Sequence, residues 1–172
     1  MSFGDYIKKG WEVIKLQGEA IDTLSKDEKG FGPGLGILAI AGVCAAIGTL
    51  NPPGIIFMPI MLIVGIFVVV GIMHFVATTF LGGQGQFKEV FVPLSCAHLL
   101  LWVSVIPILG TALSALAAIW MLVVSVIIIE RTHKIDRGKA IVVVAVPVVL
   151  WIIVFFIMTI VGVGLMALTG RF

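Results

Sequence analysis

Charge is scarce in this chain, and its absence from certain segments is informative. Only 12% of the 172 residues are charged, whereas 60% are hydrophobic and the mean hydropathy is +1.24. Such a composition excludes a soluble globular domain. None of the five long apolar stretches contains aspartate or glutamate, the groups that ion-coupled carriers usually place along the ion path. The net charge of +2 is too small to indicate a nucleic acid partner.

Motifs for catalysis and for disulfide formation are also missing. The sequence has no HExxH motif and no Ser–His–Asp or paired-carboxylate arrangement, so we expect neither an enzyme nor a cofactor. The segment GGQGQ at 82–86 lacks the GxxxxGK[ST] order of a nucleotide-binding loop. Cys44 and Cys96 form no CxxC pair and should be small buried side chains. The first residues lack the apolar core of a signal peptide.

The chain does contain five apolar stretches, and about 20 helical residues suffice to cross a bilayer. They cover about 34–50, 55–81, 90–106, 110–129 and 140–168. The second and fifth exceed one crossing, which tilt or a kink near Pro59 and Pro147 accommodates. The short uncharged turn at 107–110 predicts an antiparallel hairpin of the third and fourth stretches. The predicted fold class is all-α, a polytopic integral membrane helical bundle with five transmembrane helices.

The basic residues alternate between the connections, and this pattern predicts a topology. Ten of the eleven precede the first stretch or lie in the second and fourth connections, and Arg171 alone follows the fifth. The ten are Lys8, Lys9, Lys15, Lys26, Lys29, Lys88, Arg131, Lys134, Arg137 and Lys139. Loops rich in lysine and arginine stay inside. We therefore expect a multi-pass cell-membrane protein with its amino terminus in the cytoplasm and its carboxyl terminus outside.

The amino-terminal segment is amphipathic rather than membrane-spanning. Its apolar residues, from Phe3 to Leu24, recur every three or four positions, and charged residues fill much of the rest. This pattern predicts an amphipathic helix that lies in the membrane interface, with Trp11 at headgroup level, or docks on the cytoplasmic face of the bundle. Gly10 and Gly18 should weaken or break it. We divide the chain into this segment, 1–30, and a five-span membrane domain, 31–172.

His74, His98 and Cys96 form a candidate polar site inside the membrane. The two histidines are the ionisable groups well inside the apolar stretches, so each should face the bundle interior. A zinc or copper site built from both histidines and a cysteine is one interpretation. However, residues two apart on a helix point about 200° away from each other. We favour neutral histidines that are hydrogen-bonded to Ser, Thr or a carbonyl on a neighbouring helix, with no metal.

A second candidate site is a cytoplasmic interaction face formed by the second and fourth connections. Its members are the polar residues of these two loops: Gln84, Gln86, Lys88, Glu89, Glu130, Arg131, His133, Asp136, Arg137 and Lys139. Their mixed charges can pair with each other or with a partner. Pairing within the chain is the interpretation that we favour.

A series of short motifs extends from residue 82 to residue 147. In order, they are Gly82-Gly83, then Phe87-Lys88-Glu89, Trp102, Ile106-Pro107, Gly110, Trp120, Glu130, His133, Gly138-Lys139-Ala140 and Pro147. With these motifs in this order, the sequence resembles the Yip1 domain family from about residue 30 to 168. The resemblance implies five spans and a cytoplasmic amino terminus. Eukaryotic members act at Golgi and endoplasmic reticulum membranes, where they associate with Rab-type GTPases and with one another. This chain reduces the eukaryotic signature before the first span to Phe31-Gly32-Pro33, which favours a bacterial or archaeal cell-membrane member.

These observations favour a non-enzymatic membrane scaffold or adaptor in membrane organisation or trafficking-like processes. Its expected partners are the lipid bilayer and other membrane proteins or a second copy of itself. Small residues at Gly42 and Ala46, or Ala41 and Ala45, allow close helix approach, either between copies or within one chain. The alternatives are a small-solute or ion transporter or channel, and a lipid-handling protein. A water-lined cavity that reaches His74 and His98 would favour transport.

Overall fold

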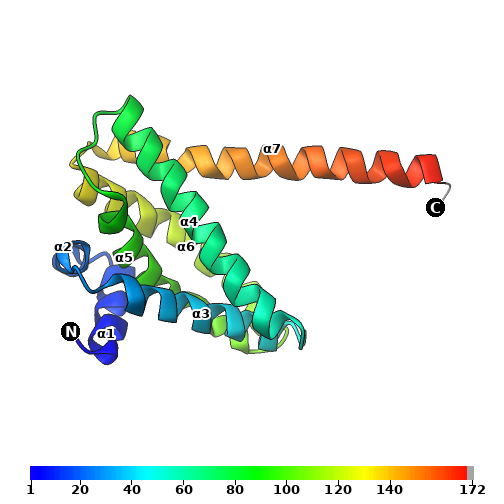
Figure 1. Cartoon of the computed structure of the whole chain (residues 1–172), viewed down its shortest axis with the longest axis horizontal. Helices are drawn as coiled ribbons and strands as arrows, with labels where there is room; N and C mark the ends of the chain where they lie inside the picture. Colours follow the sequence, from blue (N-terminus) through cyan, green and yellow to red (C-terminus); the bar gives the residue numbers. More distant parts are fainter. Residues whose placement is uncertain (170–172) are drawn as a thin grey trace.

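The computed structural model describes residues 1–169, except for the side chains of Thr111 and of residues 164–169. Its elements are α1 (Phe3–Ile14), α2 (Gly18–Lys26), α3 (Phe31–Gly48), α4 (Gly54–Phe80), α5 (Phe87–Ala97), the 3-10 helix η1 (His98–Val105), α6 (Leu109–His133) and α7 (Arg137–Thr169) (Figure 1). Within these residues there is no strand, and five helical segments are long and apolar enough to cross a membrane. The predicted all-α five-span class is confirmed. Arg171 lies outside the described residues.

The amino-terminal segment is a broken helix, as predicted, but Gly10 is not the break. Helix α1 begins with a capping box between Ser2 and Asp5, and the chain turns at Leu16, whose φ is 61°. Gly10 instead lies buried in the middle of α1, where a Cβ would come within 2.5 Å of the Cys96 carbonyl oxygen. The missing side chain therefore lets α1 pack directly on the junction of α5 and η1.

Helices α1 and α2 share one hydrophobic core with the membrane-spanning helices. Tyr6, Val13 and Leu24 are at most 1% exposed, and they belong to the same buried cluster as Phe91 and Ile128. Figure 1 shows α1 and α2 beside α5 at one end of the bundle. Of the two placements that the amphipathic pattern allows, the structure has the docked one. The segment 1–30 is thus part of the packed bundle.

The third span is not one continuous α-helix. It changes from α-helix to 3-10 helix at His98, in the middle of the apolar stretch. The His98 ring nitrogen Nδ1 donates to the carbonyl of Leu94 at 2.7 Å, and the His98 backbone N–H bonds the carbonyls of Ser95 and Cys96 instead. A side chain that takes the i−4 carbonyl competes with the α-helical bond. Apolar periodicity carries no signal for this change.

The small residues of α3 are used inside the chain. A Cβ at Gly42 would overlap the backbone of Pro59 in α4, and one at Gly48 would overlap the carbonyl of Ser104 in η1. Ala41 and Ala46 are also buried. Close backbone contact is how helices associate where lipid removes the hydrophobic drive. The sequence allows these small residues to contact either a second copy or another helix of the same chain. In the structure, they contact other helices of the same chain.

Helices α4 and α7 move apart with increasing distance from the end of the bundle where α1 and α2 lie (Figure 1). Both are continuous despite Pro59 and Pro147, and run for 27 and 33 residues. From Val149 to Val163, the large apolar side chains of α7 are exposed. A groove of about 850 Å³ lies between α3, α4, α6 and α7, with apolar walls that include Met61, Trp151 and Val154. A lipid-facing helix can expose such side chains because hydrocarbon solvates them.

Candidate functional site at the charged end of the bundle

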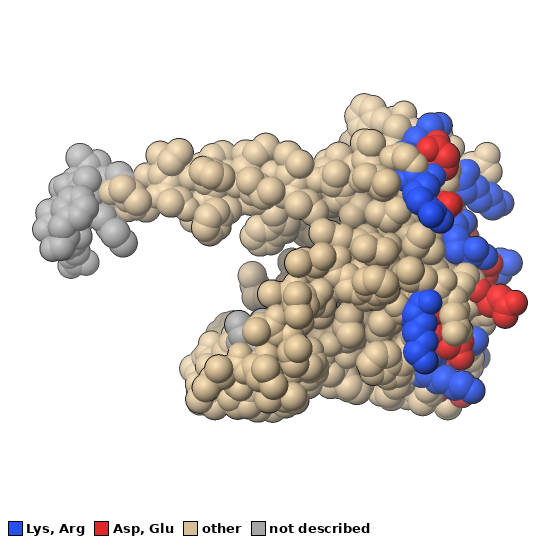
Figure 2. Space-filling view, turned by 180° about the vertical axis from the view of Figure 1, so that it is seen from behind, with Lys and Arg blue, Asp and Glu red and all other residues tan. Residues whose placement is uncertain are grey.

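The lysine, arginine, aspartate and glutamate side chains that the structure describes gather at one end of the molecule (Figure 2). We call this surface the charged end. It consists of residues 1–30, which include α1 and α2, and of the two segments 81–89 and 130–139, which join α4 to α5 and α6 to α7. Five apolar helical segments extend from it. The segregation of charge to one end separates the part of the molecule that suits water and headgroups from the part that suits hydrocarbon.

The two loops that the sequence assigned to one face lie together in the structure. The backbone N–H of Gln84 donates to the His133 carbonyl at 3.1 Å, and Lys139 Nζ approaches the Leu81 carbonyl at 3.5 Å. Gly85 fits against the end of α6, where a Cβ would come within 2.5 Å of the Thr132 carbonyl oxygen. The glycines of the loop therefore allow it to cross the end of α6 in close contact.

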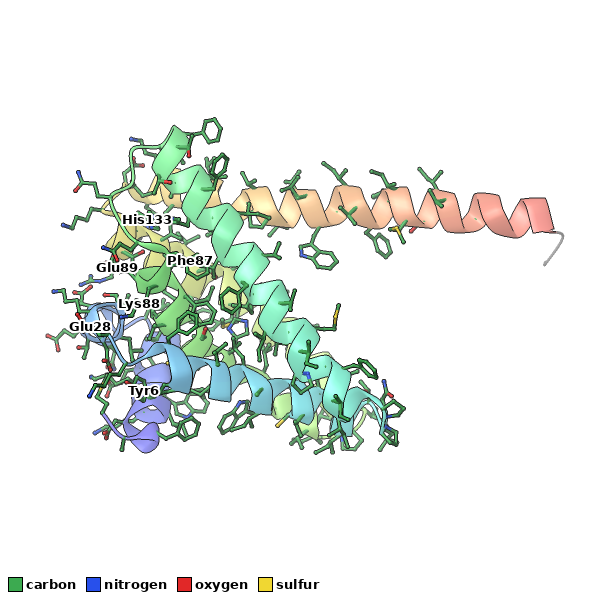
Figure 3. All side chains as sticks on the ribbon, in the orientation of Figure 1. Tyr6, Glu28, Phe87, Lys88, Glu89 and His133 are labelled. Carbon is green, nitrogen blue, oxygen red and sulfur yellow. The ribbon has the colours of Figure 1, made fainter. Side chains whose placement is uncertain are left out.

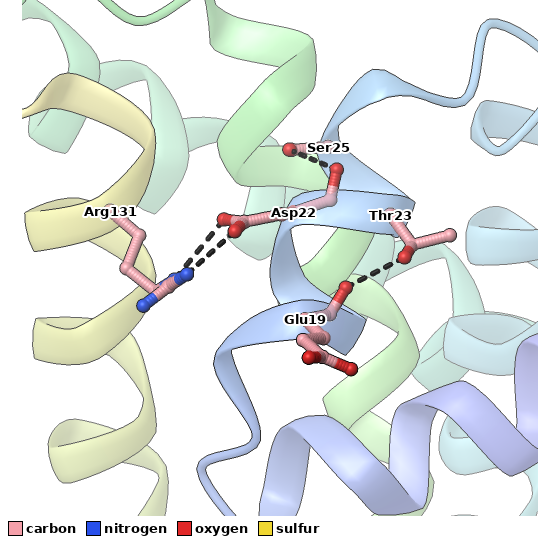
Figure 4. A network of polar contacts seen from close by, with 5 residues as sticks. All are labelled: Glu19, Asp22, Thr23, Ser25 and Arg131. Carbon is pink, nitrogen blue, oxygen red and sulfur yellow. Dashed lines mark hydrogen bonds and ion pairs between the residues drawn. The ribbon is translucent and has the colours of Figure 1, made fainter.

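Helix α2 joins the same surface through an ion pair that the sequence did not indicate. Arg131 in α6 donates from Nε and Nη2 to the two carboxylate oxygens of Asp22, at 3.1 and 2.6 Å (Figure 4). Such bidentate pairing orients both side chains. The hydrogen bonds from Arg131 lower the pKa of Asp22 below its ordinary value of 3.8. The residues are 109 positions apart, so no local pattern predicts the pair.

Helices α1 and α2 are linked by a second unpredicted contact. The Tyr6 hydroxyl donates to Asp27 Oδ2 at 2.5 Å, and Figure 3 shows Tyr6 at the start of α1. Burial of the ring, together with this hydrogen bond, raises the pKa of Tyr6 to about 12. The same bond lowers the pKa of Asp27. Tyr6 is the single tyrosine of the chain and is 1% exposed, so it anchors the first turn of α1.

Most charged members of the predicted face bond within the chain. Arg137 pairs with Glu130 at 3.0 Å, Lys139 reaches Asp136 at 4.0 Å, and Glu89 accepts from the Gln86 backbone N–H at 2.8 Å as part of a capping box. These contacts agree with the favoured interpretation of internal pairing. Arg137 and Lys139 nevertheless remain exposed, as do Gln84 and Gln86. Binding of a partner at this surface stays a prediction.

His133 lies beneath the charged end, which corrects its predicted place on the face. It is 0% exposed, and its Nε2 is 3.2 Å from Nδ1 of His74 in α4. The Thr132 hydroxyl donates to the Ile128 carbonyl, so it accepts from His133 Nδ1–H at 3.2 Å. His133 Nε2 must then accept from His74 Nδ1–H. The two rings form a directed chain that joins α4 to the end of α6, near Phe87 and Glu89 (Figure 3).

The predicted intramembrane site is divided in the structure. His74 meets His133, whereas His98 bonds the carbonyl of Leu94 on its own chain segment, and Cys96 is fully buried near α1. No group of three His, Cys, Asp or Glu side chains in the described part of the chain is spaced to hold a metal ion. Both histidines are hydrogen-bonded, but neither has the predicted partner, a Ser, a Thr or a carbonyl on a neighbouring helix. His98 bonds a carbonyl of its own span, and His74 bonds another histidine.

The charged end, the five apolar spans and the lipid-suited exterior define a multi-pass integral membrane protein. The family model of the Yip1 domain matches residues 11–167. The chain therefore belongs to the Yip1 domain family, as its loop motifs suggested. The match begins at the last turn of α1 and includes all of α2. Neither a curated protein nor a solved structure matches the chain.

Proposed function

We propose that this protein is a non-enzymatic membrane scaffold or adaptor whose charged end binds other membrane proteins or a second copy of the chain. One observation carries the proposal: contacts between distant segments join two loops and α2 into a single surface. The Arg131–Asp22 pair and the Gln84–His133 bond make these contacts. Exposed Gln84, Arg137 and Lys139 then stand on a preorganised support, which reduces the entropy that a partner must remove on binding.

The charged end faces the cytoplasm in this proposal. Ten of the eleven basic residues belong to it, and lysine and arginine in short loops are retained on the inner side. The amino terminus enters α1 at the same end. The uncharged turns around Asn51 and Ile108 then lie outside.

The internal use of the α3 surface also bears on the proposal. Because Gly42 and Gly48 pack against Pro59 and Ser104 of the same chain, they are not available to a second copy. Association through the charged end requires no change in this packing. A partner is therefore more simply accommodated at the charged end than along α3.

The competing function, transport of a small solute or ion, calls for a polar path. His98 lines a cavity of about 270 Å³ whose other walls are apolar apart from Ser125. His74 is not among the lining residues, and its Nδ1 is engaged with His133. Proton- and ion-conducting paths usually connect such groups. This geometry favours the scaffold.

A cysteine-based photo-cross-linking experiment tests both the binding surface and its orientation. Gln84→Cys and Asn51→Cys each place one exposed thiol at opposite ends of the molecule. A membrane-impermeant cross-linker should reach Gln84→Cys in inside-out vesicles and Asn51→Cys in right-side-out vesicles. On illumination, Gln84→Cys should give discrete protein adducts, whereas Asn51→Cys should give none of the same mass.

A pair of charge reversals locates the surface more finely. Arg137→Glu with Lys139→Glu should abolish the Gln84→Cys adducts. Lys26→Glu with Lys29→Glu, which makes the same change in net charge on α2 and the residues after it, should leave them. Adducts that survive the first pair and disappear with the second would place the binding surface elsewhere. An absence of adducts at Gln84→Cys would refute the scaffold proposal.

A further inference from the structure

A groove of about 610 Å³ on the outside of the bundle is bordered by three tryptophans. Trp11 comes from α1, Trp102 from η1 and Trp120 from α6. The remaining walls are aliphatic, and they include Leu99, Val103, Leu113 and Leu116. The groove therefore begins at α1, on the charged end, and continues toward the turn between η1 and α6. An apolar channel of this direction lies along the expected path of a lipid chain.

Two of the three indoles are fixed by hydrogen bonds, and the third is free to meet a ligand. Trp102 Nε1 donates to the Ile37 carbonyl at 3.3 Å, and Trp120 Nε1 donates to the Ile14 carbonyl at 2.9 Å. Trp11 is 47% exposed, and its N–H has no partner among the residues that the structure describes. Tryptophan with one apolar side and one free donor suits the headgroup level.

Two lysines lie beside Trp11 at the mouth of the groove, on the side of Trp11 that faces away from it. At 3.6 residues per turn, Lys15 and Lys8 lie about 40° and 60° around the helix axis from Trp11, and the groove-lining Ile7 and Ile14 lie about 40° and 60° in the opposite direction. Both are exposed, and in the described part of the chain neither forms an ion pair with a carboxylate, whereas Lys9 pairs with Glu12 at 3.1 Å. Two ammonium groups without ion pairs thus stand where an apolar groove meets the charged end.

We propose that this groove binds a phospholipid with an anionic headgroup. One acyl chain lies along the groove between Trp102 and Trp120, and the phosphate contacts Lys8, Lys15 and the Trp11 N–H. The acyl chain supplies little preference over the bilayer, since lipid tails are as apolar as the groove walls. Selectivity comes from the two ammonium groups, and it should reach about tenfold over a zwitterionic lipid. This inference does not depend on the scaffold proposal.

The larger groove between α4 and α7 provides the internal comparison. Its volume is about 850 Å³, and none of its lining residues is next to a lysine or arginine in the chain, whereas Ile7 and Ile14 of the tryptophan-bordered groove directly precede Lys8 and Lys15. Bulk lipid or another helix can fill it without a headgroup preference. The mouth charges, rather than apolar volume, therefore mark the tryptophan-bordered groove as the specific site.

Quenching of tryptophan fluorescence by brominated lipids tests the proposal. The full chain carrying Trp151→Phe, which removes the indole of the other groove, is reconstituted in phosphatidylcholine vesicles. Brominated phosphatidylglycerol should reach half-maximal quenching at about one tenth of the mole fraction that brominated phosphatidylcholine requires. Equal quenching curves for the two lipids would overturn the proposal.

Matched charge removals separate a defined site from diffuse attraction. Lys8→Gln with Lys15→Gln should bring the two quenching curves together, whereas Lys26→Gln with Lys29→Gln should preserve the tenfold difference. Loss of the preference in both pairs would show diffuse attraction to the charged end, and it would refute the site. Ala117→Phe narrows the groove but keeps both lysines, so it should weaken quenching by both lipids. Efficient disulfide formation between copies at Trp11→Cys would instead assign the groove to a second chain.

Discussion

The half of the bundle near the charged end and the outer half of α7 are held in place very differently. Phe91 is fully buried, and its ring centroid lies 4.6 Å from that of Phe31 and 4.8 Å from that of Phe67. By contrast, Phe155 and Phe156 in α7 are 68% and 63% exposed. The contrast shows where side-chain packing, rather than hydropathy, organises the protein. Lipid solvates the outer residues, so no hydrophobic force draws them together.

The largest expected effect comes from removing a large buried side chain from the half of the bundle near the charged end. Phe91→Ala removes a ring that packs against three others, so the free energy of unfolding should fall by about 3–5 kcal/mol. Phe155→Ala makes the same chemical change on exposed α7 and should alter it by less than about 0.5 kcal/mol. Thermal unfolding in detergent, followed by circular dichroism, compares the variants. Similar losses for both would contradict the difference in packing.

A smaller effect is expected where two helices touch through glycine. Gly42→Leu forces the Pro59 backbone away from α3 and should cost about 1–3 kcal/mol. Gly71→Leu on α4 meets no atom within 4 Å of the new Cβ, and it should be neutral or slightly stabilising because leucine favours helix. The same thermal measurement ranks the two variants. A destabilised Gly71→Leu protein would mean that its face of α4 is occupied by something other than lipid.

The smallest effect is a pH dependence at the charged end. Because the pKa of folded Asp22 is lowered, the Arg131 pair stabilises the protein fully above pH 3.8 and loses its contribution as the pH falls through the folded value. Both side chains are partly exposed, so the contribution should stay below about 1 kcal/mol. Hydrogen exchange of α2, corrected for intrinsic rates, should show less protection at pH 3 than at pH 6. In Asp22→Asn this difference should shrink, and an unchanged difference would assign it to other carboxylates.

Some contacts of the candidate site could be predicted from patterns in the sequence, and others could not. Two connections were assigned to one face: the loop containing Gly83 and Gly85, and the turn before α7. The number of spans and the distribution of charge place both connections on the same side of the membrane. Asp22 and Tyr6 were missed because their partners, Arg131 and Asp27, lie 109 and 21 positions away. His133 was misplaced since its flanking charges suggest exposure, although its ring is buried against His74.

The amino-acid sequence alone determined the number of spans, their approximate ends and the segregation of charge. These features follow from the cost of placing charges and unpaired backbone groups in hydrocarbon, which acts on each segment separately. Tertiary structure decided which surfaces meet: α1 against the α5–η1 junction, Gly42 against Pro59, and Trp120 against Ile14. Such choices depend on shape and on hydrogen-bond direction between distant segments. Hydropathy contains information on neither shape nor hydrogen-bond direction, because lipid solvates every apolar face of a helix equally well.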